Sequence, residues 1–141
     1  MVTKMHHSIP RKILNGAIKF HGHLGVFLVL GLKAGLYAKE KLENDSFKMY
    51  ACIETKPFPP FSCFIDGVQV TTGCTMGKMN IELKNGNSIL VRFTKGGSQL
   101  TLMVKPDLLE EITNISSINE NRKLALSLIK KPIEDLFQIT Y

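Results

Sequence analysis

The sequence lacks tryptophan and contains few arginines and few aromatic residues. Only three of its 18 basic residues are arginines (Arg11, Arg92 and Arg122), whereas proteins that read nucleic acids depend on arginine for bidentate contacts. Aromatic residues make up 8% of the chain, and no cluster of basic and aromatic side chains offers a surface on which bases could stack. We therefore expect no nucleic-acid partner, although the net charge of +6 favours anionic ligands.

Cysteines and long apolar runs are also scarce. Three cysteines in 141 residues exclude a small disulfide scaffold, so the cysteines are expected to be thiols or metal ligands. The most apolar stretch, residues 24–38, contains Lys33 and is shorter than the roughly 20 residues that a membrane-spanning helix needs. Residues 1–7 lack the apolar core of a signal peptide. These absences predict a cytoplasmic protein with no membrane segment.

The remaining pattern predicts a single α+β domain over residues 1–141. The expected helices cover residues 9–19, 24–43, 63–72, 119–131 and 132–137, with one more opening at Pro106, and the expected strands cover residues 46–56, 80–84, 88–93 and 99–104. Asn85-Gly86-Asn87 predicts a hairpin between the second and third strands. The helix at 24–43 is apolar all round in its first half, so we expect it to be buried against a mostly antiparallel sheet.

A first candidate site is His21-Gly22-His23, at the entry to the buried helix. Side chains two residues apart in an extended turn can project to the same side. Two imidazoles there could bind a metal, or one of them could act as a base. The alternative is structural: the two histidines cap a helix by hydrogen bonds. Residue type alone does not decide between these interpretations.

A second candidate site lies between Cys63 and Cys74. If residues 63–72 are helical, Cys63, Asp66 and Gln69 share one face. Cys63 would lie in the first helical turn, where the helix dipole stabilises a thiolate, and Lys78 would have a similar effect on Cys74. Either cysteine, with Asp66 as proton acceptor, is a candidate catalytic residue. The alternative treats both cysteines as small buried hydrophobic residues, which is also the interpretation given to Cys52.

Two runs of the sequence resemble the FmdE family, whose members are described as FmdE-type subunits of formylmethanofuran dehydrogenase or as homologues of these. The first run is Phe20-His21-Gly22-His23-Leu24-Gly25, followed by Gly31 and Gly35. The second run is Pro59-Pro60-Phe61-Ser62-Cys63-Phe64-Ile65-Asp66-Gly67-Val68-Gln69, continuing through Thr72-Gly73-Cys74-Thr75-Met76-Gly77-Lys78-Met79-Asn80. The two runs occur in the family's order and cover residues 20–80.

The resemblance implies an α+β core that forms an intertwined homodimer. It also implies a metal site built from His21, His23, Cys63 and Cys74, with Asp66 and Gln69 beside the ligands. The chain departs from the family pattern at Gly25-Val26, where members often have Pro or Cys-Pro, and at Met79, where members often have Gly. It has no paired CxxC motifs, so we expect a core-only form without the zinc ribbon that some members carry.

Three hypotheses for function follow. The leading one is a metal-binding protein, most simply a zinc protein, because mixed imidazole and thiolate ligands suit zinc, with nickel and iron as alternatives. The second is an accessory subunit that hands a metal or cofactor to a partner oxidoreductase without turnover. The third is a metal-free thiol enzyme that uses Cys63 or Cys74. Whether the protein is an enzyme stays open, and the sequence support for a homodimer beyond the resemblance is the Gly31/Gly35 face.

Overall fold

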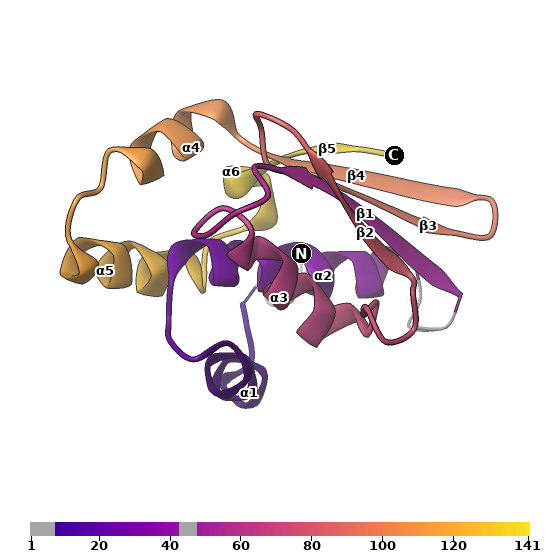
Figure 1. Cartoon of the computed structure of the whole chain (residues 1–141), viewed down its shortest axis with the longest axis horizontal. Coiled ribbons are helices and arrows are strands. Elements are labelled where there is room, and N and C mark those ends of the chain that lie inside the picture. Colours follow the sequence, from indigo (N-terminus) through magenta and orange to yellow (C-terminus); the bar gives the residue numbers. More distant parts are fainter. Residues whose placement is uncertain (1–7, 43–47) are drawn as a thin grey trace.

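In the computed structural model, which describes residues 8–42 and 48–141, a five-stranded sheet lies against helices grouped around one long central helix (Figure 1). The helices are α1 (Arg11–His21), α2 (Val26–Leu42), α3 (Cys63–Thr72), α4 (Pro106–Thr113), α5 (Ile118–Leu128) and α6 (Ile133–Leu136). The strands are β1 (Met49–Thr55), β2 (Ile81–Asn85), β3 (Leu90–Lys95), β4 (Ser98–Val104) and β5 (Phe137–Thr140). The predicted α+β class is confirmed. No helix in the described ranges is long and apolar enough to cross a membrane.

The sheet has the strand order β2-β1-β3-β4-β5. Three of its four pairings are antiparallel, and only β1 and β2 run parallel. The sheet is therefore mostly antiparallel, as predicted. Strand β1 begins at Met49, and residues 46 and 47 of the predicted strand lie outside the described residues.

The predicted hairpin between the second and third strands is wrong. Strand β2 pairs with β1, and β1 also pairs with β3, so β1 lies between the two strands that the turn connects. The turn crosses the end of β1, where the Gly86 N–H donates to the Thr55 carbonyl at 3.1 Å. The physical reason is burial: Ala51 and Ile53 of β1 are fully buried, whereas Leu83 of β2 remains 39% exposed. The most apolar strand takes the interior position and β2 takes the edge.

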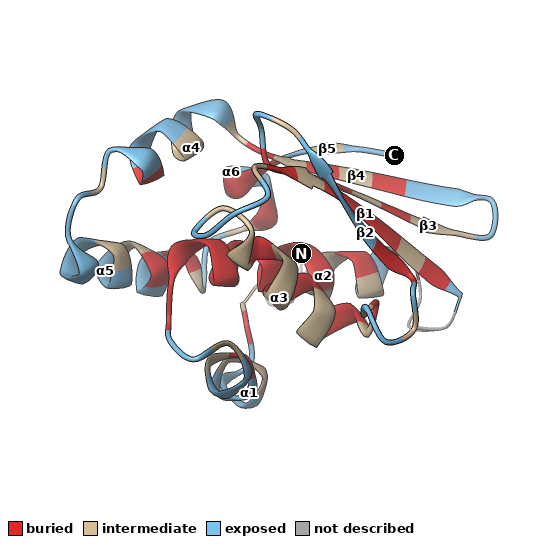
Figure 2. Cartoon of the chain, in the orientation of Figure 1, coloured by how far each residue is buried: buried red, intermediate tan, exposed pale blue. Residues whose placement is uncertain are grey.

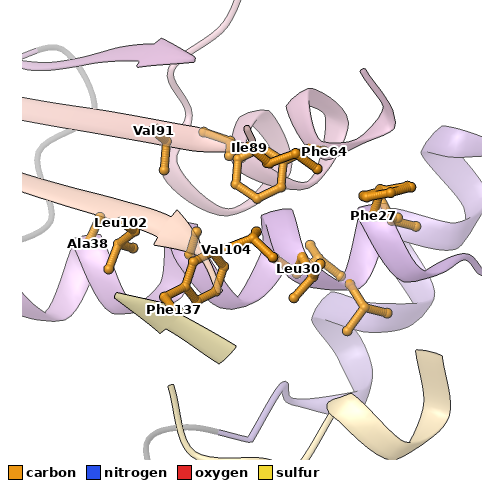
Figure 3. Close-up of a cluster of buried hydrophobic side chains, with 14 of the residues drawn as sticks. Phe27, Leu30, Ala38, Phe64, Ile89, Val91, Leu102, Val104 and Phe137 are labelled. Carbon is orange, nitrogen blue, oxygen red and sulfur yellow. The ribbon is translucent and has the colours of Figure 1, made fainter. Parts of the chain in front are cut away.

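Helix α2 forms the centre of the hydrophobic core, as its apolar sequence predicts. Twelve of its 17 residues are buried, and Figure 2 shows the burial concentrated where α2, α3 and the sheet meet. Leu30 of α2 packs near Phe64 of α3 and Phe137 of β5 in the core cluster (Figure 3). The core joins helices and strands from all parts of the chain, so it fixes where each loop emerges.

Helices α2 and α3 cross in close contact through glycine. A Cβ atom added at Gly31 would lie 2.2 Å from the Phe64 carbonyl oxygen, and one added at Gly67 would lie 2.5 Å from the Leu28 carbonyl oxygen. A Cβ at Gly35 would collide with the Thr71 hydroxyl. The Gly31/Gly35 face does allow a close approach, but the helix that packs against it is α3 of the same chain. This face therefore gives no support for a homodimer.

The C-terminal end also differs from the prediction. Residues 132–137 were expected to be helical, whereas helix α6 ends at Leu136 and Phe137 begins strand β5, paired with β4. The alternation over residues 137–140, with Phe137 buried and Gln138 exposed, follows the period of a strand. Four residues are too few for this period to be recognised beside a stronger helical signal.

Candidate functional site

A pocket of about 270 Å³ opens where α1, α2, α3 and α5 approach one another. Its wall contains two histidines, one cysteine, backbone from the first turn of α2, and the segment that begins α5. The lining residues are His21, His23, Leu24, Gly25, Val26, Phe27, Leu28, Pro60, Cys63, Ile115, Ser116, Ser117, Ile118 and Asn121. Three of the four predicted metal ligands, His21, His23 and Cys63, therefore share one pocket.

His21 is the last residue of α1, and Gly22 ends the helix in the left-handed conformation with φ of +112°. This turn directs the imidazole toward α3, where its Nδ1 lies 2.5 Å from Asp66 Oδ2. The side chain of His21 is only 10% exposed. Its Nε2, on the other side of the ring, is buried and has no hydrogen-bond partner among the described residues. In the neutral tautomer that carries its proton on Nδ1 toward this carboxylate, Nε2 presents a lone pair.

His23 and Cys63 complete the polar side of the pocket. The His23 ring centroid lies 4.8 Å from that of His21, and the His23 side chain is exposed. Cys63 begins α3 and is partly buried. Burial raises the pKa of the Cys63 thiol, and the nearby Asp66 carboxylate raises it further. The expected lowering of this pKa by the helix dipole is therefore wrong for the protein without a bound cation, because desolvation is the larger effect.

Asp66 lies behind the pocket and is not part of its lining. It contacts His21 through Oδ2, and its Oδ1 accepts a long hydrogen bond of 3.5 Å from Gln69 Nε2. The Oε1 atom of Gln69 in turn accepts the Met76 N–H at 3.2 Å. Asp66 thus contacts His21, and Gln69 contacts Asp66, while their role beside metal ligands stays a prediction. Asp66 can orient and polarise His21, which is the usual role of a carboxylate behind a ligating histidine.

Cys74 and Cys52 lie away from this pocket. Cys74 follows the C-terminal end of α3, whereas Cys63 begins it, so the helix of about 15 Å separates them. Cys74 is fully buried, and its Sγ donates to the Met49 carbonyl at 3.4 Å. Burial raises its pKa, although the Thr72 hydroxyl and Lys78 act in the opposite direction. The structure does not bring Cys74 together with His21, His23 and Cys63.

No group of three or more His, Cys, Asp or Glu side chains stands close enough together to hold a metal ion within residues 8–42 and 48–141. The pocket instead offers one buried imidazole nitrogen, a second imidazole beside it, and a thiol in the same wall. These groups are donors of the types that bind metals, but as placed here they do not form a coordination site.

Sequence reasoning missed the wall contributed by the start of α5. Asn121 Oδ1 accepts the Val26 N–H at 3.2 Å and so joins α5 to the first turn of α2. Ser117 is the N-cap of α5: its hydroxyl accepts the Glu120 N–H at 3.0 Å and donates to the Glu120 carboxylate at 3.0 Å. The sequence motif S-x-x-E could have located the start of this helix. Nothing in the sequence indicates that the helix start would lie 95 residues away beside the histidines.

Two comparisons with known proteins bear on the site. The family model described as "FmdE, Molybdenum formylmethanofuran dehydrogenase operon" matches residues 20–138, which include every lining residue of the pocket. A curated protein of Archaeoglobus fulgidus named "Probable S-adenosyl-L-methionine-binding protein" is 31% identical over 132 residues. That alignment covers 86% of this chain but 32% of the relative, so the chain spans about a third of the relative's length.

Proposed function

The chain belongs to the FmdE family, and we propose that it is a metal-binding member of this family whose pocket takes up a divalent metal, zinc, on the imidazoles of His21 and His23, with the Cys63 side chain of the same wall moving in as the third ligand. The observation that carries the proposal is the state of the His21 imidazole. Its Nε2 is buried without a hydrogen-bond partner among the described residues, while Asp66 holds Nδ1 at 2.5 Å. A buried polar atom without a partner is costly, and a bound cation would remove that cost.

The residues of the pocket fit a zinc ion by donor type. Imidazole nitrogen and thiolate sulfur are both common zinc ligands, and nickel and iron accept the same donors. A metal in the pocket would act as a Lewis acid toward a bound oxygen atom. Asp66 would fix the orientation of His21 and increase its basicity. A cation would also reverse the present preference of Cys63 for the neutral thiol, because a nearby positive charge lowers a thiol pKa.

The test separates the two cysteines. We expect Cys63→Ser to lose most of the zinc that the wild-type protein carries after reconstitution under reducing conditions, because it removes a donor in the pocket. Cys74→Ser is the matched control and should keep its zinc, because Cys74 is buried at the far end of α3. Metal content would be measured by plasma mass spectrometry on untagged protein, with a second reconstitution in nickel or ferrous iron.

Two results would contradict the proposal. If wild-type protein takes up none of the three metals, the metal-binding function is wrong. If Cys74→Ser loses the metal and Cys63→Ser keeps it, the site is elsewhere. A metal-free thiol enzyme would then be reconsidered, although burial raises the pKa of both thiols and so disfavours the reactive thiolate.

A second candidate function is delivery of a metal to an oxidoreductase, with formylmethanofuran dehydrogenase the partner that the family description suggests. The exposed side chain of His23 favours it, since an exposed ligand exchanges readily. Transfer of zinc to a chelator within minutes would support delivery, whereas retention over hours would support a resident metal.

From the family resemblance, we also propose that the protein forms a homodimer. A sedimentation mass near that of a single 15.8 kDa chain would contradict the homodimer.

S-adenosyl-L-methionine is the ligand named for the relative from Archaeoglobus fulgidus. Two-thirds of that relative lies outside the aligned region. We therefore do not extend its named ligand to this chain.

A further inference from the structure

The pocket beside His21 has two chemically different walls. One wall, formed by the start of α2 and the start of α5, supplies hydrogen-bond donors, whereas the His21 imidazole on the other wall supplies an acceptor. None of the lining residues in the described part of the chain is Lys, Arg, Asp or Glu. Selection of a ligand by this pocket therefore depends on hydrogen bonds and on the partial charges of helix ends.

The donor wall begins with the first turn of α2. Val26 N–H donates to Asn121 Oδ1. The next two N–H groups, of Phe27 and Leu28, have no acceptor among the described residues, and both residues line the pocket and are almost fully buried. A buried N–H group without an acceptor is costly, and the first N–H groups of a helix commonly bind anions.

The start of α5 extends the donor wall. Because Asn121 Oδ1 is occupied by Val26, the Nδ2 of the same amide keeps its two donors for the pocket. Ser116 adds a hydroxyl group, whereas the hydroxyl of Ser117 is already bonded to Glu120. The N-termini of α2 and α5 each carry a partial positive charge of roughly half an elementary charge. These groups suit a ligand with one negative charge better than a phosphate dianion, for which the described lining has no cationic side chain.

The acceptor on the opposite wall is His21 Nε2. The His21 side chain is only 10% exposed, and Nε2 has no hydrogen-bond partner among the described residues. In the tautomer that Asp66 favours, this nitrogen accepts one hydrogen bond. Nε2 itself has almost no accessible surface, so a ligand reaches it when the neighbouring His23 ring, an exposed side chain with its centroid 4.8 Å away, turns aside.

A hydroxyl group fits this acceptor better than an ammonium group does. A hydroxyl group has one proton to donate, which matches the single acceptor. An ammonium group has three, and the described lining has no carboxylate to accept the others. The positive helix ends also oppose a positive charge on the ligand.

The two walls lie close together, so the ligand that bridges them is compact. A Cβ atom added at Gly25 would lie 3.4 Å from His23 Nε2 and 3.6 Å from Asn121 Oδ1. At about 30 Å³ for each water-sized group, the pocket volume of about 270 Å³ holds about nine non-hydrogen atoms. A hydroxyl on the carbon next to a carboxylate meets both requirements.

We infer that the pocket of the zinc-free protein binds a small α-hydroxycarboxylate, with its carboxylate at the start of α2 and its hydroxyl donating to His21 Nε2. This inference goes beyond the proposed function and requires no metal. Because zinc and the hydroxyl would use the same nitrogen, the two ligands exclude each other. By linkage, each lowers the affinity for the other by the same factor.

The experiment is an NMR titration of isotope-labelled, zinc-free protein with glycolate at constant ionic strength. It follows the backbone amide signals of Phe27 and Leu28 and the imidazole nitrogens of His21. We expect glycolate to shift these signals and to bind about tenfold more tightly than acetate, which lacks the hydroxyl group. Glycolamide, which lacks the charge, and glycine, which has an ammonium group in place of the hydroxyl, should both bind more weakly than glycolate.

Three results of this titration would overturn the inference. Equal affinities for glycolate and acetate would show that His21 does not accept the hydroxyl of the ligand. Tighter binding of glycine or of inorganic phosphate would assign the pocket to another class of ligand. Shifts confined to signals outside the pocket would place the anion elsewhere.

A pair of variants on α5 tests the position of the carboxylate. Asn121→Asp keeps an acceptor for the Val26 N–H but replaces the Nδ2 donor with a charged oxygen, so glycolate binding should be lost. Asn119→Asp makes the same charge change in the first turn of the same helix, at an exposed residue outside the lining, and should bind glycolate as the wild type does. Equal losses in both variants would indicate general charge repulsion and would contradict this placement.

The inference and the proposed function fail separately. Zinc-free protein that ignores glycolate would overturn the hydroxycarboxylate inference and leave the metal-binding function standing. Protein that binds glycolate but takes up no metal would overturn the metal-binding function alone. Where both ligands bind, saturation with zinc should abolish the shifts caused by glycolate, and glycolate binding unchanged by zinc would overturn the role given to His21 Nε2.

Discussion

At the residue scale, one contact decides which nitrogen of His21 is available to a ligand. Asp66 lies 2.5 Å from Nδ1, so in the neutral imidazole it favours the tautomer with the proton on Nδ1, which leaves the lone pair on Nε2. The carboxylate is about one-third exposed. It can therefore be replaced without opening a cavity in the core, which makes it suitable for a test of function separate from folding.

We expect Asp66→Asn to weaken zinc binding by about 10- to 100-fold while leaving the fold intact, because the neutral amide no longer orients and polarises His21. Zinc affinity would be measured by chelator competition, and folding by thermal denaturation of the zinc-free protein. Glu82→Gln is the control, since Glu82 is an exposed carboxylate that accepts a hydrogen bond from Tyr50 far from the pocket. An unchanged zinc affinity in Asp66→Asn would show that Asp66 does not support a ligand.

The sequence indicated the residues of the candidate site and the family resemblance grouped them, but neither showed that Cys74 would lie apart from the other three. His21, His23 and Cys63 come together because α1, α2 and α3 meet at the pocket, and Asp66 follows Cys63 by one helical turn. In the sequence, Cys74 is as good a candidate ligand as Cys63, yet it lies at the opposite end of α3. Spacing along the chain does not reveal the distance between Cys63 and Cys74, because it is the length of α3 that separates them.

Met79 stands where family members often have Gly. Its φ is positive, +57°, which is the conformation that glycine favours.

At the scale of elements, the crossing of α2 over α3 positions Cys63 and Asp66 relative to the histidines. The two helices touch backbone to backbone at Gly31 and Gly67, where no side chain fits. Protein interiors are densely packed and cannot absorb an added methyl group against a neighbouring main chain. The site geometry therefore depends on residues that never contact a ligand.

We expect Gly31→Ala to reduce the free energy of unfolding by about 3 kcal/mol or more, because its Cβ would lie 2.2 Å from the Phe64 carbonyl oxygen. Gly16→Ala is the matched control in α1, where no atom lies within 4 Å of the added Cβ. It should stabilise the protein by about 0.5–1 kcal/mol, since alanine is favoured over glycine in a helix. Urea denaturation would measure both. A small loss in Gly31→Ala would mean that α2 and α3 can separate without penalty.

The elements themselves were largely predictable, because each long segment has a clear period. Helices α2 and α3 and strand β4 lie within a few residues of their predicted positions. Strand partnership was not predictable from the turn: Asn85-Gly86-Asn87 is a good hairpin sequence, but the more apolar β1 occupies the space between β2 and β3. Local turn preference is weak beside the burial of a whole strand.

At the scale of the whole molecule, Lys33 connects the central helix to the C-terminal end of α5. Its Nζ donates to the Ile129 carbonyl at 3.1 Å and to the Lys131 carbonyl at 2.6 Å, while Asn121 joins the start of the same helix to α2. Helix α5 is thus held at both ends against α2, and its N-terminal end forms one wall of the pocket. Lys33 is only 2% exposed, and burial lowers its pKa to about 8.

This pKa makes the stability of the whole chain depend on pH in a defined direction. Between pH 8 and the ordinary lysine pKa of 10.5, the unfolded chain binds a proton at Lys33 that the folded chain does not. Stability from this group therefore rises with pH across that window, by about 2 kcal/mol between about pH 8 and pH 10. Tyr50 acts in the opposite direction: its hydrogen bond to Glu82 raises its pKa to about 12, so above about pH 10 the folded chain keeps a phenol proton that the unfolded chain loses, and stability falls as pH rises.

Comparison with Lys33→Met isolates the lysine, because all other groups titrate equally in both proteins. We expect the free energy of unfolding of the wild type, relative to that of Lys33→Met, to rise by about 2 kcal/mol between about pH 8 and pH 10. Below about pH 7 the difference between the two proteins should stay constant. Urea denaturation at each pH would measure both. Lys123→Met, at an exposed position on α5, should show the same pH dependence of the free energy of unfolding as the wild type. A wild-type curve parallel to that of Lys33→Met would mean that the Lys33 ammonium is not desolvated, and that α5 opens readily enough to let water reach it.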